Sequence, residues 1–282
     1  MDQAIAPELG TVQETLLIPL YGRAVETRDP DGMLRDPKAL EMVAALDYDF
    51  ARFDGKPSLF GSVFRTLLFD HWIRAFLAER PTGTVVEIGC GLNTRYERTD
   101  NGRAHWLNLD LPDAIALRLR LFGPDGERRR TVGGSVLDEP WLAEAAALPG
   151  PLFFSAEAVL PYLSEEEVRG LMSRLAHRFP GSLLATDAAA ASMVDTQDEH
   201  DALSLMAARM QWHCDDARTP ESWHPDIRLL ETRTFTDYPT VILDALPAPR
   251  REFVDVMTAE VPEKLAAYRL NLYRLGDGFS PS

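Results

Sequence analysis

The chain has 282 residues, which is long enough for one large domain or for a core with an attached subdomain. Its composition, 45% hydrophobic and 26% charged, is that of an ordinary globular protein and excludes a disordered or fibrous one. The 29 lysines and arginines against 44 aspartates and glutamates give a formal net charge of −15. A field of that sign repels phosphate backbones, so we expect no nucleic-acid partner.

Cysteines and apolar runs are both sparse. Cys90 and Cys214 are too few for a disulfide framework or a metal cluster, so we expect no metal site. No apolar run approaches the roughly 18 residues that a membrane span needs, and residues 1–10 lack the basic start and apolar stretch of a secretion signal. We therefore expect a cytoplasmic protein with no membrane contact. Whether it is a monomer or a homo-oligomer stays open.

The first 80 residues are expected to form a helical N-terminal cap. Their best helical stretch is 62–77, where apolar side chains recur at helical spacing. Pro81, Thr82 and Gly83 then break the chain.

From residue 84 onward, strand and helix patterns alternate. Short β-branched or apolar runs predict strands at 84–88, 105–110, 131–137, 152–155 and 182–186. Helices are expected at about 112–122 and after Ser164, where Ser164 and Glu167 form a capping box. Regular alternation of this kind predicts a Rossmann-like α/β core, residues 81–190, with a parallel sheet and helices on both of its faces.

The remaining chain is expected to cover and complete this sheet. It reads as helical again from 188 to about 216, which suggests a lid or substrate cover over residues 191–226. Residues 227–282 contain two more expected strands, 227–235 and 268–275, with a helix from about 250 to 267 between them. Together these segments predict a seven-stranded sheet. The run of arginines at 128–130 is interpreted as a solvated connection, with an anionic partner as the alternative.

A glycine loop follows the first expected strand. Gly89 and Gly91 allow the backbone to pass close to a ligand, because no Cβ intrudes and positive φ is permitted. Glu87 precedes them, where a negative charge suits a sulfonium amino acid better than a pyrophosphate. Thr94 occupies the place of the third glycine of a dinucleotide loop, which argues against NAD. Asp110 ends the second strand and can bind both ribose hydroxyls, although an ordinary strand end is the simpler alternative.

These residues belong to a longer resemblance. Residues 85–96, VVEIGCGLNTRY, resemble the first motif of the leucine carboxyl methyltransferase family, in the form typical of its bacterial branch, the tetracenomycin-type polyketide O-methyltransferases. Further similar segments occur in an unchanged order, at 15–24, 34–39, 109–113, 135–138 and 156–163. The likeness therefore covers most of the chain from about residue 15 to 187.

The resemblance implies an S-adenosylmethionine-dependent methyltransferase and assigns residues to its cofactor. Arg65 would pair with the cofactor's carboxylate, for which a guanidinium offers a planar fork, and Glu157 would face the amino-acid end. Other implied positions are Gly89 and Gly91 beneath the methionine moiety, Asp110 at the ribose, and Ser135 and Val136 beside the adenine. Arg95 is either an ion-pair partner of Glu87 or a second cofactor contact. Three residues depart from the family pattern: Asn93 replaces an aspartate, Ala158 a glycine and Pro161 a methionine.

The resemblance further implies O-methylation of a carboxyl or phenolic oxygen on an aromatic, polyketide-like small molecule of secondary metabolism. A carboxylate is already ionised at neutral pH, whereas a phenol, with a pKa of roughly 10, benefits from a base. The candidate bases are His200, His213 and His224, all in or beside the expected cover. Five side chains of the same region suit either an apolar pocket or simple core packing: Met193, Met206, Met210, Trp212 and Trp223.

Two other functions stay open at this point. A non-catalytic cofactor-binding protein is suggested by Ala158 and Pro161, which lie next to the expected transfer site. An NAD-linked oxidoreductase would share the strand, glycine loop and strand-end acid, but lacks its third glycine here.

Overall fold

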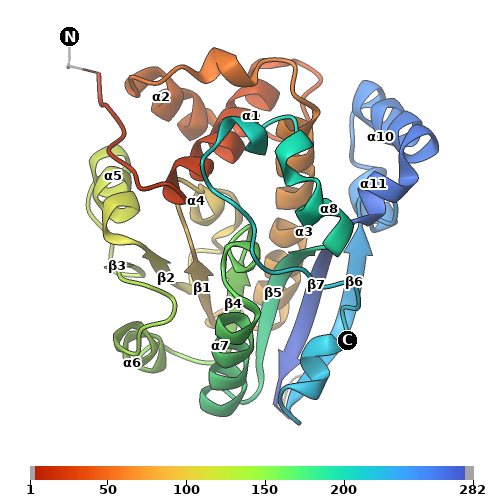
Figure 1. Ribbon diagram of the computed structural model, residues 1–282. Helices are drawn as coiled ribbons and strands as arrows, with labels where there is room; N and C mark the ends of the chain where they lie inside the picture. The colour runs from red at the N-terminus through yellow and green to blue at the C-terminus, as the bar shows by residue number, and fades with distance from the viewer. Residues whose placement is uncertain (1–3, 277–282) are drawn as a thin grey trace.

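The computed structural model describes residues 4–276 and contains a seven-stranded sheet with helices on both faces (Figure 1). The strand order is β3-β2-β1-β4-β5-β7-β6, and all neighbours are parallel except β7, which runs antiparallel to β5 and β6. The strands are β1 (Thr84–Ile88), β2 (His105–Asp110), β3 (Arg129–Gly133), β4 (Leu152–Ala156), β5 (Ser182–Ala189), β6 (Ile227–Thr234) and β7 (Tyr268–Leu275). The predicted Rossmann-like α/β sheet is confirmed.

The helices divide between the two faces because successive strand residues point to opposite sides. Val85 packs in a cluster with Phe69 and Phe76 of α3, whereas Val86 packs with Trp141 of α6 and Leu171 of α7. Figure 1 accordingly shows α6 and α7 on one face and α3 on the other. The helices are α1 (Leu17–Arg28), α2 (Pro37–Ala45), α3 (Pro57–Glu79), α4 (Arg95–Thr99), α5 (Pro112–Phe122), α6 (Pro140–Ala146), α7 (Glu165–Arg178), α8 (Ala191–Asp195), α9 (Thr240–Leu243), α10 (Ala248–Glu260) and α11 (Pro262–Ala266).

The N-terminal segment caps the edge of the sheet where the parallel strands end. In Figure 1, α1 and α2 lie above the carboxyl ends of the central strands. The segment is tied to α5 through Asp113, which accepts hydrogen bonds from Gly10 N at 2.7 Å and from Gln13 Nε2 at 3.0 Å. Leu17 and Leu20 pack in one buried cluster with Leu92 of the glycine loop. Ligands of open α/β sheets bind at this edge, so the N-terminal segment covers the expected binding site.

The structure confirms two local predictions, the helix at 112–122 and the capping box at Ser164. The helix expected at 112–122 is α5, and the capping box at the start of α7 has both of its halves. Ser164 N donates to Glu167 Oε2 at 2.8 Å, and Glu167 N donates to Ser164 Oγ at 3.3 Å. Each bond satisfies a backbone N–H that the helix cannot satisfy itself.

The third strand lies earlier in the chain than the predicted 131–137. β3 is Arg129–Gly133, and Ser135 begins a turn in which its backbone N–H donates to Asp138 Oδ2. The arginines at 128–130 are therefore not a solvated connection. Arg128 Nη2 lies 2.6 Å from Asp100 Oδ2, and Arg129 Nη1 lies 2.9 Å from Glu97 Oε1. Because β3 is at the sheet edge, its side chains can be charged, which hid the strand from a hydrophobicity pattern.

The cover between β5 and β6 is also less helical than predicted. Residues 191–226 contain α8 and three short 3₁₀ turns, and the rest is irregular. Non-helical hydrogen bonds hold the backbone there: Met210 N donates to the side-chain Oε1 of Gln197 at 2.7 Å, and Gln211 N donates to the backbone carbonyl of Pro161 at 2.7 Å. The single helix expected at 250–267 is two helices, because Pro262 begins α11 after α10 has ended.

Two further observations concern residues 4–276 as a whole. None of their helices combines the length and hydropathy that crossing a bilayer requires. Their acidic, histidine and cysteine side chains form no group of three or more that could hold a metal ion. Residues 1–3, part of the segment considered as a secretion signal, lie outside the described residues.

Candidate functional site

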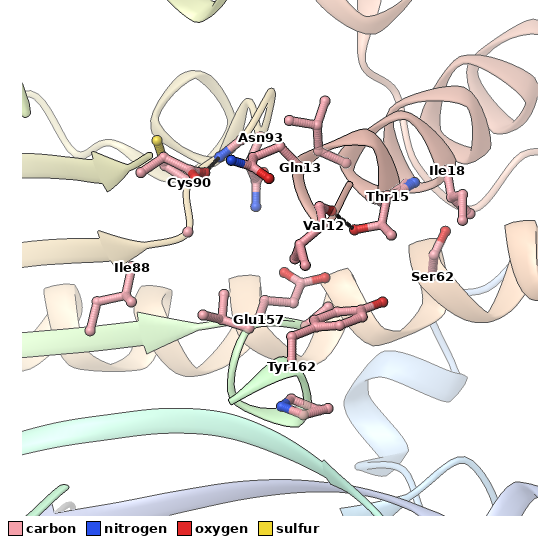
Figure 2. A pocket seen from close by; sticks show the side chains of 18 of the residues that line it. Val12, Gln13, Thr15, Ile18, Ser62, Ile88, Cys90, Asn93, Glu157 and Tyr162 are labelled. Carbon is pink, nitrogen blue, oxygen red and sulfur yellow. Dashed lines mark hydrogen bonds between the residues drawn. The ribbon is translucent and has the colours of Figure 1, made fainter. Parts of the chain in front are cut away.

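A cavity of about 380 Å³ lies at the carboxyl ends of the central strands, beneath the N-terminal segment. Figure 2 shows Glu157 and Tyr162 projecting from the loop after β4 toward Val12 and Thr15 of that segment. All eight residues that the sequence assigns to cofactor binding line this one cavity: Arg65, Glu87, Gly89, Gly91, Asp110, Ser135, Val136 and Glu157. Residues from five separate parts of the chain are thus brought to a single place.

The glycine loop has the conformation for which glycine is needed. Gly89 has φ of +64° and Gly91 has φ of +42°. A Cβ on Gly89 would lie 2.3 Å from Val159 Cγ2, a distance that real atoms do not reach. Both the backbone angle and the close packing of Val159 therefore require glycine at 89, and the two glycines line the cavity without adding side chains to it.

Asp110 fixes this loop against the end of β2. Its Oδ2 accepts a hydrogen bond from Gly91 N and its Oδ1 accepts one from Leu111 N, both at 2.7 Å. Burial raises the pKa of Asp110, and the two N–H groups act against that rise. A carboxylate has about four lone-pair sites, so each oxygen retains one for a ligand hydroxyl. The group is thus held in place and still free to accept two hydrogen bonds.

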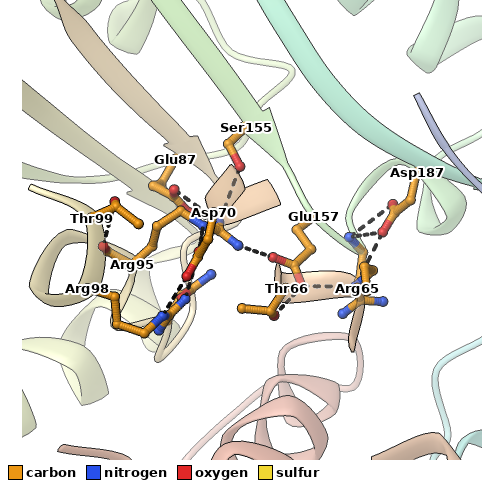
Figure 3. A network of polar contacts seen from close by, with 12 residues as sticks. Arg65, Thr66, Asp70, Glu87, Arg95, Arg98, Thr99, Ser155, Glu157 and Asp187 are labelled. Atoms are coloured by element: carbon orange, nitrogen blue, oxygen red, sulfur yellow. Dashed lines mark hydrogen bonds and ion pairs between the residues drawn. The ribbon is translucent and has the colours of Figure 1, made fainter. Parts of the chain in front are cut away.

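One buried arginine joins the acids around the cavity (Figure 3). Arg95 is 1% exposed; its Nε donates to Asp70 Oδ1 at 2.8 Å and its Nη1 donates to Glu87 Oε2 at 2.9 Å. Its Nη2 donates to Glu157 Oε2. Burial opposes the ionisation of Glu157, but the charges of Arg95 and Arg65 outweigh it and hold the pKa of Glu157 at about 2. Arg95 is therefore an internal ion-pair partner, the first of the two roles considered for it.

Arg65 extends the same network from α3 into the cavity. Its Nε donates to Glu157 Oε1 at 2.9 Å, and its Nη1 donates to the hydroxyl of Tyr268 at 3.1 Å. Burial disfavours its charge, yet Tyr268, Glu157 and Asp187 raise the pKa of Arg65 and keep it protonated. A charged guanidinium with part of its fork still available can receive a ligand carboxylate.

Ala158 has an unusual backbone for a residue with a side chain. Its φ is +57°, in the left-handed region that favours glycine. Its N–H donates to both carboxylate oxygens of Asp187, at 3.0 and 2.8 Å. The turn after β4 thus requires the conformation that the family's usual glycine adopts freely, and Asp187 holds it in place here. The alanine that replaces the family's glycine at 158 is therefore held in a conformation that glycine would adopt more easily.

The three candidate histidines do not share a location. His200 lines the cavity, whereas His213 and His224 are absent from its lining; the side chain of His213 is 53% exposed, beside Asp215. His200 Nδ1 lies 3.3 Å from Ala202 N, 3.1 Å from Leu203 N and 3.2 Å from Asp201 Oδ1. Burial lowers its pKa. Of the three, only His200 is placed where it could act on a ligand in this cavity.

The lining contains residues that the sequence did not single out. Val12, Gln13, Thr15 and Leu16 come from the N-terminal segment, for which the family likeness at 15–24 was the available signal. Apolar and aromatic side chains line the cavity beside Arg65: Tyr162, Met193, Leu203, Met210, Phe235 and Tyr268. Met206 and Trp212 are buried in core clusters instead, and Trp223 packs against one, so only two of the five proposed pocket side chains line the cavity.

Comparisons with known proteins agree with this geometry. The family model of leucine carboxyl methyltransferases matches residues 17–176. The tetracenomycin polyketide synthesis O-methyltransferase TcmP of Streptomyces glaucescens is 31% identical over 264 residues, 93% of this chain and 96% of that protein. The S-adenosyl-L-methionine-dependent methyltransferase dpfgK of Gibberella zeae is 26% identical over 78% of this chain and 80% of its own length. A protein of Thermobifida fusca described as a methyltransferase superposes with a TM-score of 0.58 at 14% identity, over 92% of this chain and 94% of its own.

The sheet with its antiparallel β7 and the cavity at the glycine loop define an S-adenosylmethionine-dependent methyltransferase. Within that class, the chain belongs to the leucine carboxyl methyltransferase family. The resemblance read from the sequence is confirmed, and the alternative of an NAD-linked oxidoreductase is wrong.

The strain at Ala158 gives a first prediction. Ala158→Gly should raise the free energy of unfolding by about 1 kcal/mol, because the left-handed conformation costs a residue with a Cβ roughly 1–2 kcal/mol. Ala156→Gly, two residues earlier in β4, is the matched control and should lower it by about 1 kcal/mol. Urea denaturation followed by fluorescence measures both. Similar losses in the two variants would show that Ala158 is not strained.

Proposed function

We propose that this enzyme transfers a methyl group to a carboxyl or phenolic oxygen of an aromatic, polyketide-like small molecule in secondary metabolism. The observation that carries the proposal is the composition of the cavity. One part is lined by the glycine loop and by the carboxylate of Asp110 at the end of β2, which suit a nucleoside-containing cofactor. The adjoining part is lined by apolar and aromatic side chains. The relative TcmP, whose name states O-methylation in tetracenomycin synthesis, supports the same class of acceptor.

The residues present fit S-adenosylmethionine. We assign Asp110 to the ribose hydroxyls, Gly89 and Gly91 to the methionine moiety, and the turn at Ser135 and Val136 to the adenine. Arg65 has a free part of its fork for the carboxylate, and Glu87 and Glu157 place negative charge beside the amino-acid end. When bound, the cofactor supplies a methyl group whose sulfonium sulfur is the leaving group for an in-line displacement by the acceptor oxygen.

The chain itself contributes position and charge to this reaction. Glu87 and Glu157 are fixed by Arg95 before any ligand binds, so the polar wall needs no reorganisation. The N-terminal segment covers the cavity through Thr15, Leu16 and Ile18, which limits access of water to the reacting groups. The displacement needs no covalent enzyme intermediate. Much of the rate enhancement can therefore come from holding the acceptor oxygen in line with the methyl group.

The assignment of Asp110 is tested by its removal. Asp110→Ala should weaken S-adenosylmethionine binding by about 1–3 kcal/mol, because a buried charged hydrogen-bond acceptor is lost from the cavity. Asp125→Ala, which removes the same charge near the start of β3, should leave the affinity within about twofold of wild type. Isothermal titration calorimetry measures both. Equal affinities of the Asp110 variant and wild type would contradict the ribose assignment.

The acceptor class is tested with a panel of small molecules. The enzyme and S-adenosylmethionine should methylate aromatic carboxylic acids or phenols at oxygen, as identified by mass spectrometry of the products. Aromatic amines and thiols, and peptides with a free C-terminus, serve as controls of different chemistry and should stay unmodified. If only these controls are methylated, the proposed acceptor is wrong, although the fold and cofactor are unaffected.

A further inference from the structure

Tyr268 connects the cavity with Asp187, a buried acid that has no role in the reaction as described so far. Tyr268 is the first residue of β7 and lines the cavity, while Asp187 lies on the neighbouring strand β5 and is 0% exposed. The hydroxyl of Tyr268 donates a hydrogen bond to Asp187 Oδ2 at 2.8 Å. Asp187 itself is not part of the cavity lining, so Tyr268 stands between this acid and a bound ligand.

The hydrogen bonds of Tyr268 leave one site free. A tyrosine hydroxyl has one proton and two acceptor sites. Its proton is directed to Asp187, and one acceptor site receives Arg65 Nη1 at 3.1 Å. The second acceptor site is available to an O–H group of a ligand in the cavity. The neighbouring guanidinium also stabilises any negative charge that develops on the tyrosine oxygen.

The surroundings of Tyr268 suit an aromatic ring. Phe235 stacks on it, with ring centroids 5.9 Å apart and an interplanar angle of 10°. Met193 and Met210 line the cavity from the irregular segment after β5, and they belong to the same small cluster as Tyr268. A flat apolar acceptor can therefore pack here with a polar group directed toward the tyrosine oxygen.

The hydrogen bonds at Tyr268 suit a hydroxyl rather than a carboxylate. Asp187 already receives the proton of the tyrosine hydroxyl and Arg65 occupies one of its acceptor sites, so the position left open is a lone pair. A phenol can donate its O–H to that lone pair. A carboxylate has no proton to donate and would place its own lone pairs against it.

We propose that Tyr268 and Asp187 form a proton relay that deprotonates a phenolic hydroxyl of the acceptor, with Tyr268 as the catalytic residue and Asp187 acting through it. The inference rests on the proposed O-methylation. The acceptor's O–H bond breaks and its proton passes to Tyr268 Oη, while the proton of Tyr268 passes to Asp187 Oδ2. The acceptor oxygen forms the bond to the methyl carbon, and the carbon–sulfur bond breaks with its electron pair left on sulfur.

The environment of Asp187 is consistent with this role. Burial raises its pKa to about 6, although Arg65, the Tyr268 hydroxyl and the N–H of Ala158 act in the opposite direction. The ionisable groups that face it are Arg65 from α3, Glu157 and Tyr162 from the segment after β4, Tyr268 from β7 and Tyr238 before α9. At neutral pH the acid is therefore ionised and able to take a proton. Below about pH 6 it is protonated and the relay stops.

Tyr268→Phe tests the relay, because it removes the hydroxyl but keeps the ring and the bonds from Ala158 to Asp187. The probes are 2-naphthol and its more acidic 1-nitro derivative, which is ionised without enzyme at about pH 8. The variant should lower kcat for 2-naphthol by about 100-fold, a typical contribution of a base, and kcat for the nitro derivative by less than about threefold. In wild type, kcat for 2-naphthol should rise with pH through about 6, and the variant should lose this rise.

A binding measurement needs no methyl transfer. Fluorescence titration of the cofactor-free enzyme should show 2-naphthol binding about fivefold more weakly to Tyr268→Phe than to wild type, as expected for one lost hydrogen bond. 2-Methoxynaphthalene, which has no O–H to donate, should bind equally to both. Tyr273→Phe is the control variant: Tyr273 lies on the same strand, its hydroxyl donates to the carbonyl of Ala217 and it does not line the cavity, so the variant should behave as wild type.

Equal loss of kcat for the two naphthols, or unchanged 2-naphthol binding, would overturn the relay. If wild type methylates aromatic carboxylic acids but no naphthol, the relay is wrong and the proposed O-methylation stands. If wild type binds S-adenosylmethionine but methylates no aromatic acid or phenol, the proposed function itself fails.

Discussion

The structure depends on a buried positive charge at the first turn after the glycine loop. Arg95 contacts acids from three different elements: Asp70 on α3, Glu87 on β1 and Glu157 after β4. A charge in the interior is tolerated only when its hydrogen-bonding groups are satisfied, so these elements cannot move independently. The positions of α3, of the glycine loop and of the loop after β4 are therefore coupled, and these three elements form much of the cavity wall.

The same network divides the cavity into two chemically different parts. Glu87, Glu157 and the strand-end Asp110 give the glycine-loop part a fixed polar wall. Beyond Arg65, the lining becomes apolar and aromatic, with Phe235 and Tyr268 stacked on one another. The first part suits a cofactor with a charged amino-acid end, and the second suits the flat ring of the proposed acceptor.

The sequence predicts the central strands and the start of α7, because buried strands and helix caps leave local patterns in the sequence. The strands that begin at Thr84 and His105 are buried on both faces of the sheet. The capping box at Ser164 marks the start of α7. β3 was misplaced because an edge strand can carry arginines. The segment after β5 was read as helical because its apolar residues fill the cavity and core from irregular backbone. Asp187 and Tyr268 are distant in sequence and meet only through the antiparallel pairing of β5 and β7, which no local pattern contains.

We infer that Arg95 organises the cofactor site before the cofactor binds. The most direct measurement is the calorimetric dissociation constant of S-adenosylmethionine for Arg95→Lys, which keeps the charge but cannot reach three acids at once. The dissociation constant should be at least about 10-fold higher than that of wild type, whereas Arg74→Lys, which changes an exposed neighbour of Asp70, should leave it unchanged. A folded Arg95→Lys protein that binds the cofactor as tightly as wild type would contradict it.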